Sequence, residues 1–131
     1  MKEEFLHYLW KYSLYEQDSL IDNESNRIVV INPGEYNRDS GPDFFNARIS
    51  IAVTEWAGNV EIHSRASHFN THGHNSDHAF DNVILHVVAE NDKKVFNSRN
   101  EELLTVEIKY DPCLYEKYTD LINNPCVIAC Q

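Results

Sequence analysis

The chain has 131 residues, 42% of them hydrophobic, and a formal net charge of −10. This length fits a single domain with a core of its own, and no apolar run approaches the roughly 20 residues of a membrane span. The acidic balance weighs against a nucleic-acid partner, because such proteins usually present a basic face to the phosphates. The start of the chain, Met1-Lys2-Glu3-Glu4, lacks the apolar core of a signal peptide, so we expect a cytoplasmic protein.

The first part of the chain is expected to hold a helix and a strand. Phe5, Leu9 and Tyr12 recur at helical spacing and predict a helix over residues 3–15. A polar stretch separates this helix from the β-branched run 27–31, which predicts a short strand.

Two further strands are expected in the middle of the chain. Apolar and polar residues alternate over 43–53, which predicts a half-buried strand. The apolar members of this alternation are expected to face the core: Phe45, Ala47, Ile49, Ile51 and Val53. Residues 55–58 should then turn the chain into a strand over 59–64. On that strand Glu61 and His63 share the face opposite the apolar residues.

The second half of the chain predicts two more strands and a helix. Residues 65–80 are rich in histidine and predict a loop with room for a short helix. The apolar run 83–88 predicts a strand covered on both faces, and the alternation over 103–110 predicts another. Asp111-Pro112 is typical of a helix start. The order of these elements predicts an α+β fold with a mixed central sheet and flanking helices.

Three polar residues on the two middle strands form the first candidate site. Asp43 opens one strand, and Glu61 and His63 follow on the next, so an antiparallel pair would bring their side chains together. Two carboxylates on one sheet face can hold a divalent cation such as Mg²⁺ or Mn²⁺. A cation held in this way lowers the pKa of bound water and stabilises charge on a phosphodiester. We therefore predict that Asp43 and Glu61 are metal ligands.

Pro42-Asp43 and Glu61-Ile62-His63 resemble the signature of the PD-(D/E)XK nuclease superfamily, with His63 at the position of its lysine. The resemblance implies a restriction-endonuclease-like fold and a metal-dependent nuclease or phosphodiesterase acting on nucleic acid. It also implies that Asp43 and Glu61 bind the metal and that His63 orients or deprotonates the attacking water. The alternative is a non-catalytic binding or scaffold module on the same sheet, because a histidine is mostly neutral at pH 7 whereas a lysine is charged.

A second resemblance covers nearly the whole chain and rests on four segments, 5–10, 41–49, 56–63 and 81–88. They resemble a bacterial family that is common in Bacteroidetes and is numbered 2851 among the domains of unknown function. That family has no established activity, so the resemblance implies relatives and no reaction. Its members are typically longer, and we expect residues 1–131 to be a single domain from the N-terminal part of a longer chain.

The histidine-rich segment offers an alternative metal site. His72, His74 and His78 lie close together along the chain, and three or four such ligands suit Zn²⁺. The same segment could instead be a polar loop that covers the face of Asp43 and Glu61.

Two other features are assigned structural roles. His86 lies inside an apolar strand and is expected to be a hydrogen-bonded core residue. Glu107-Ile108-Lys109, preceded by Asp92, is a literal match to the nuclease triplet. Its strand is expected to have one solvated face, where a glutamate and a lysine two residues apart are common, so we prefer the site at Asp43 and Glu61.

Overall fold

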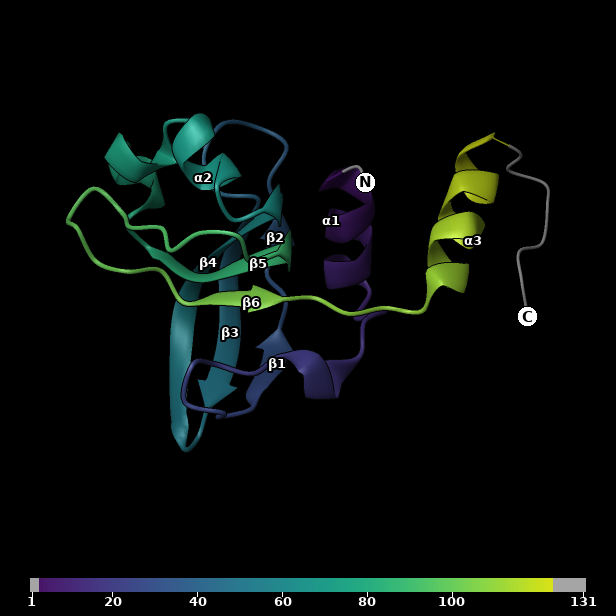
Figure 1. Cartoon of the computed structure of the whole chain (residues 1–131), viewed down its shortest axis with the longest axis horizontal. Helices are drawn as coiled ribbons and strands as arrows, with labels where there is room; N and C mark the ends of the chain where they lie inside the picture. The colour runs from purple at the N-terminus through teal and green to yellow at the C-terminus, as the bar shows by residue number, and fades with distance from the viewer. Residues whose placement is uncertain (1–2, 124–131) are drawn as a thin grey trace.

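The computed structural model describes residues 3–123 and places six strands in one mixed sheet with helices packed around it (Figure 1). The strands are β1 (Ile28–Asn32), β2 (Glu35–Tyr36), β3 (Phe44–Ile51), β4 (Thr54–Arg65), β5 (Val83–Glu90) and β6 (Thr105–Glu107). The α-helices are α1 (Glu3–Lys11), α2 (His68–Thr71) and α3 (Pro112–Asn123). Short 3-10 helices cover Gln17–Ser19, His74–Ser76 and His78–Phe80.

The sheet combines antiparallel and parallel pairs. β1 and β4 flank β3 and are antiparallel to it, and β2 pairs with the first residues of β3. β5 runs parallel to β4, and β6 runs parallel to β5. A parallel neighbour requires a crossover connection, which the segment containing α2 supplies between β4 and β5. The predicted α+β class with a mixed sheet and flanking helices is confirmed.

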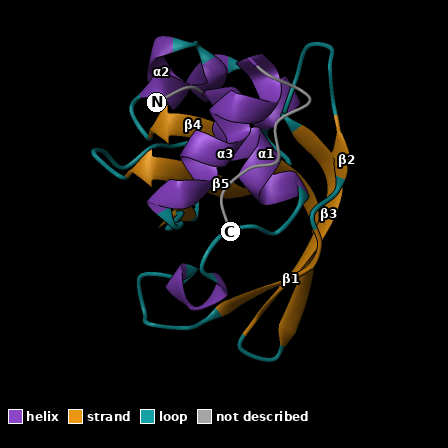
Figure 2. Cartoon of the chain, turned by 90° about the vertical axis from the view of Figure 1, so that its right-hand side faces the viewer, coloured by secondary structure: helices purple, strands orange, loops and turns teal. Residues whose placement is uncertain are grey.

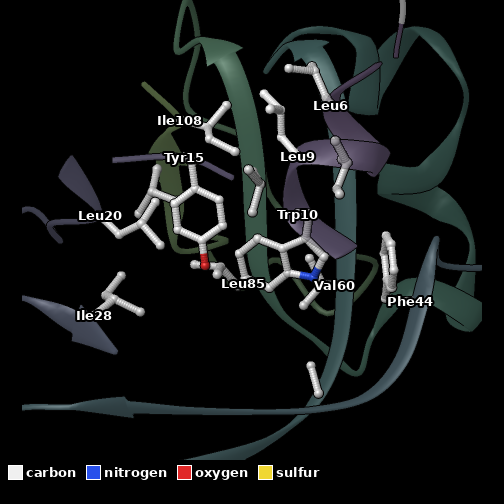
Figure 3. Packing of buried hydrophobic residues seen from close by; sticks show 14 of the residues in the cluster. Leu6, Leu9, Trp10, Tyr15, Leu20, Ile28, Phe44, Val60, Leu85 and Ile108 are labelled. Atoms are coloured by element: carbon white, nitrogen blue, oxygen red, sulfur yellow. The ribbon is translucent and has the colours of Figure 1, made fainter. Parts of the chain in front are cut away.

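The main core lies between α1 and the sheet. Phe5, Leu6, Leu9 and Trp10 are fully buried on one face of α1, where Trp10 packs among sheet residues such as Val60 (Figure 3). Burial of these large side chains stabilises the domain, since truncating a buried Phe or Trp typically costs about 3–5 kcal/mol. The predicted helix was too long at its end. The structure ends it at Lys11 because the next turn breaks at a residue with positive φ, 54° at Ser13.

The strand β3 contains a bulge that changes which residues face the core. The register shifts between Phe44 and Ala47, and Asn46 adopts a φ of 60°. As a result Phe44, rather than Phe45, is buried beside Ala47 and Ile49, contrary to the prediction from strict alternation. An extra residue in one strand reverses the face of every residue before it, which alternation alone does not reveal.

The turn between β3 and β4 also differs from the prediction. It lies at Ala52-Val53, where Val53 is fully exposed, and not at residues 55–58. β4 therefore begins at Thr54 and is longer than expected. Gly58 lies inside this strand. A larger residue does not fit there, because a Cβ would come within 2.4 Å of Ile84 Cγ2 on the neighbouring strand.

A second, smaller core lies on the other side of β4 and β5. Phe69 of α2 packs there with Phe80, Val95 and Leu103. These side chains hold the histidine-rich segment against the sheet, and Figure 1 shows α2 beyond the end of β4.

The last described elements close the main core. The helix predicted after Asp111-Pro112 is confirmed as α3, and it lies next to α1 (Figure 2). The ring of Phe5 contacts the rings of Tyr115 and Tyr118 at centroid distances of 5.0 and 5.2 Å. Among the described helices, none is both long and apolar enough to cross a membrane.

Candidate metal centre

The loop before β3 holds Asp43 at the head of the strand. Gly41 has a φ of 101°, a conformation that residues with a Cβ rarely adopt. The Asn37 side chain donates hydrogen bonds to the carbonyls of Ser40 and Pro42 at 3.0 and 2.9 Å. The Asn37 N–H donates to the Asp43 carbonyl at 2.8 Å, so one asparagine closes the loop.

Asp43 and Glu61 link the start of β3 to the middle of β4. The Asp43 N–H donates to Glu61 Oε1 at 3.1 Å, and the Ile62 N–H donates to Asp43 Oδ2 at 2.8 Å. The Glu61 side chain is almost fully buried, with 3% of its surface exposed, whereas 23% of Asp43 is exposed. The structure thus brings together the two carboxyl groups that the sequence singled out.

The histidine-rich segment folds onto the same place. Asp92 receives hydrogen bonds from the N–H and Oγ of Ser67 at 2.9 and 2.7 Å, which anchors the start of α2. His72 ends α2, and Gly73, with a φ of 76°, turns the chain so that His74 points back toward β4. The His74 ring stacks on Phe80 at a centroid distance of 3.8 Å.

Three histidines meet beside the Glu61 carboxyl group. One ligand atom each from His63, His72 and His74 lies within 4.8 Å of the other two. Glu61 Oε2 lies 2.9 Å from His74 Nε2 and 3.5 Å from His63 Nε2. Apart from His78, the side chains of the two metal sites considered from the sequence therefore lie next to one another.

His86 supports His63 from the adjacent strand β5. His86 is fully buried, and its Nε2 lies 2.8 Å from His63 Nδ1. Its expected role as a hydrogen-bonded core residue matches this placement. If His63 binds a metal through Nε2, its proton must sit on Nδ1 and is donated to His86. His86 therefore orients the His63 ring toward Glu61.

Burial and mutual contact set the protonation of these groups. Burial raises the pKa of Glu61 to about 10, and the hydrogen bond and charge of Asp43 add to that rise. Burial also opposes ionisation of Asp43, but hydrogen bonds from His7 and Glu61 outweigh it and lower the pKa of Asp43. The two carboxyl groups thus share one proton, held mainly by Glu61.

Burial favours the neutral form, which is the form that binds metals, in His63, His74 and His86. Burial lowers the pKa of His63 to about 2, with a further contribution from His86. Burial lowers the pKa of His86 to about 3. The pKa of His74 is lowered by burial and then by His72. Neutral imidazole offers a free lone pair to a cation.

Sequence reasoning missed two residues of α1 that lie beside the site and are distant from it along the chain, His7 and Glu3. His7 Nε2 lies 3.4 Å from Asp43 Oδ2, and its Nδ1 lies 3.4 Å from the Tyr36 hydroxyl. Glu3 Oε2 lies 3.7 Å from His68 Nδ1, which connects the start of α1 to α2. The position of His7 between the apolar residues Leu6 and Leu9 of α1 was the one available signal, and it did not reveal the partner of His7.

His78 and the second nuclease-like triplet lie elsewhere. The His78 side chain is 87% exposed and contacts Asp81 at 3.0 Å, apart from the His63, His72 and His74 cluster. Lys109 forms an ion pair with Glu107 at 3.0 Å on the surface, and Asp92 is occupied by Ser67 at the start of α2.

A family model described as a protein of unknown function, DUF2851, matches residues 3–131. The chain belongs to this family. The resemblance inferred from four segments of the sequence is thereby confirmed, while the family description names no activity. The searches of curated proteins and of solved structures each found no match.

Proposed function

We propose that this domain is a metal-dependent phosphodiesterase of the nuclease type, with its ion held by His63, His72 and His74 beside Glu61. The observation that carries the proposal is the convergence of the three imidazoles within 4.8 Å, next to a buried carboxyl group. The cluster combines His63 of β4 with His72 and His74 of the following loop. Contacts such as the stack of the His74 ring on Phe80 hold this loop in place.

The donor set suits a transition-metal ion. Imidazole nitrogens with one carboxylate are common ligands of Zn²⁺, and imidazole also binds other divalent transition metals. Mg²⁺ takes mainly oxygen ligands, which the described side chains of this site offer through Glu61 and Asp43. We therefore favour Zn²⁺ over the Mg²⁺ or Mn²⁺ that the paired carboxylates alone suggest.

The arrangement of elements supports phosphodiester chemistry. A helix, the antiparallel strands β1, β3 and β4 with the two-residue β2 among them, a helical segment and a parallel strand follow one another, an order similar to that expected for a PD-(D/E)XK core. Asp43 and Glu61 occupy the positions of the two acidic residues in that signature, and His63 occupies that of the lysine. On this basis we propose a restriction-endonuclease-like fold.

The residues of the site would divide the work as follows. A bound ion supplies a water of lowered pKa and stabilises negative charge on a phosphate oxygen. His63, His72 and His74 hold the ion, and His86 keeps the His63 ring in place. Glu61 would lie beside the ion, whose positive charge would favour the ionised carboxylate, with the proton released to solvent. Asp43 lies at the more exposed edge of the site, where a substrate would approach from solvent.

Calorimetric titration of the protein with Zn²⁺, Mn²⁺ and Mg²⁺ tests the site. His72→Ala is the informative variant, because His72 is exposed and its loss should leave the fold intact. We expect it to weaken Zn²⁺ binding by more than about tenfold, since even the outer partners of metal ligands are worth about 10- to 100-fold. His78→Ala is the matched control, an exposed histidine outside the cluster. Equal Zn²⁺ affinity in the two variants would contradict the site.

A cleavage assay separates the enzyme from a non-catalytic module. The metal-loaded protein is incubated with bis(p-nitrophenyl) phosphate and with single- and double-stranded DNA. We expect hydrolysis that depends on the ion and is lost in His72→Ala but not in His78→Ala. Tight metal binding without any hydrolysis would favour the binding or scaffold alternative, which the acidic net charge of −10 also suggests.

A further inference from the structure

A groove of about 320 Å³ lies between α1, α3 and the segment that follows β2. Its lining is rich in tyrosines that come from different elements: Tyr8, Tyr12, Tyr36 and Tyr118. Tyr12 is 55% exposed and Tyr36 is 40% exposed, so both offer ring surface to a ligand. Tyr8 contacts Tyr12 and Tyr118 at centroid distances of 5.3 and 5.1 Å, which joins three of the rings into a continuous wall.

Two cations accompany these rings. Lys11 Nζ lies 5.3 Å from the centre of the Tyr12 ring, and Arg38 Cζ lies 5.9 Å from the centre of the Tyr36 ring. Both cations line the groove, and Glu4 is the one acidic residue among the described residues that line it with them. In a chain with a net charge of −10, this is a local surface of opposite sign.

A larger cavity elsewhere lacks this character. It measures about 910 Å³ and is lined by the exposed Trp56, but it also contains Glu35, Glu101 and Glu102, with Arg99 as its cation. These carboxylates would repel a negatively charged ligand. The larger cavity therefore differs from the tyrosine groove in charge, although both expose an aromatic ring.

The His7 side chain separates the tyrosine groove from the candidate metal site and contacts both. The His7 side chain lines the groove, and its ring lies 5.5 Å from that of Tyr36. Its Nε2 lies 3.4 Å from Asp43 Oδ2, at the edge of the candidate site. A ligand that occupies the groove is therefore one side chain away from Asp43.

We propose that this groove binds single-stranded nucleic acid, with bases stacked on the exposed tyrosines and phosphates next to Lys11 and Arg38. Stacking requires open base faces, which a single strand offers and a duplex keeps internal. The groove is also too small to take a duplex, and the acidic remainder of the surface opposes one. The role of the groove in presenting a phosphodiester to Asp43 rests on the proposed function, whereas binding of the strand does not.

Fluorescence anisotropy tests the inference with a labelled short oligothymidylate, alone and as its duplex with oligoadenylate. The titrations contain EDTA, so that neither metal binding nor cleavage contributes. We expect the single strand to bind more tightly than the duplex. The double variant Tyr12→Ala, Tyr36→Ala should weaken binding by at least about tenfold, since each stacked base contributes measurably to affinity. Tyr12→Phe, Tyr36→Phe should restore it because the ring faces remain.

The salt dependence tests the two cations. Lys11→Gln with Arg38→Gln should reduce the slope of log affinity against log salt by about 0.7 for each phosphate that is no longer neutralised. Lys93→Gln with Lys94→Gln is the control for charge, and Trp56→Ala is the control for an exposed aromatic residue. Both controls should bind the strand as the unchanged protein does.

The outcomes separate this inference from the proposed function. Preferred binding of the duplex, or unchanged affinity in the Tyr12→Ala, Tyr36→Ala variant, would overturn the inference that the groove binds a single strand. Zn²⁺ binding at the histidines without any strand binding would overturn the inference about the groove and leave the proposed metal site standing. Strand binding that depends on the tyrosines, in a protein that binds no metal, would support the groove and overturn the proposed function.

Discussion

Replacing Glu61 by glutamine tests the shared proton of the candidate site. Glutamine has nearly the same shape and can still accept the Asp43 N–H, which donates to Glu61 Oε1 at 3.1 Å. It has no proton to lose, however. The variant therefore isolates the cost of ionising a buried carboxyl group from the cost of changing its packing.

The sign and size of the effect follow from the two pKa values. The Glu61 carboxyl has a reference value of 4.5 when it is solvated, as in the unfolded chain, whereas in the folded protein its pKa is raised to about 10. The stability gained from the retained proton is complete below the unfolded pKa and is lost as the pH rises toward the folded pKa. Each pH unit in this window costs about 1.4 kcal/mol. Between pH 7 and pH 9 the loss amounts to about 3 kcal/mol.

Urea unfolding of both proteins at several pH values, in the presence of EDTA, measures this difference. Relative to the unchanged protein, the Glu61→Gln variant should become more stable by about 3 kcal/mol between pH 7 and pH 9, because only the unchanged protein has this buried carboxyl group to ionise. Glu116→Gln, an exposed change on α3, should show no such gain. A stability difference between Glu61→Gln and the unchanged protein that stays constant over this range would refute the assignment of a protonated Glu61.

Two further changes test the support of the site and of the sheet. His86→Leu should weaken Zn²⁺ binding by about 10- to 100-fold because it removes the partner of His63 Nδ1, and His86→Gln should recover part of the loss; equal affinities by calorimetry would show that His86 does not orient His63. Gly58→Ala should destabilise the domain by about 1–3 kcal/mol in urea unfolding, because its Cβ would meet Ile84 Cγ2 at 2.4 Å and Asn82 O at 2.9 Å. Unfolding at an unchanged urea concentration would mean that β4 and β5 are packed less closely than these distances require.

Local patterns in the sequence were sufficient for most elements and for part of the site. Periodicity located α1, β1, β5 and α3, because in each of them apolar residues are buried in the main core or pack against it. The spacing of Asp43 and Glu61 on successive strands predicted that their carboxyl groups would meet, since two antiparallel neighbours leave little freedom in where their ends lie. The family, too, was recognisable from short segments.

The tertiary structure decided how the site is completed. No periodicity describes the chain from α2 to β5, whose path depends on burial of Phe69 and Phe80 and on the anchoring of Ser67 by Asp92. Those contacts, distant in sequence, place His72 and His74 beside Glu61 and leave His78 outside.

The sequence by itself determined most of the strands and the acidic pair, because these depend on side chains that alternate within one segment. Only the tertiary structure joined the acidic pair to the histidines, brought His7 to Asp43, and exchanged Phe45 for Phe44 in the core through the bulge at Asn46. Such features depend on contacts between segments and on single backbone irregularities, whose energies are set by packing in the folded state.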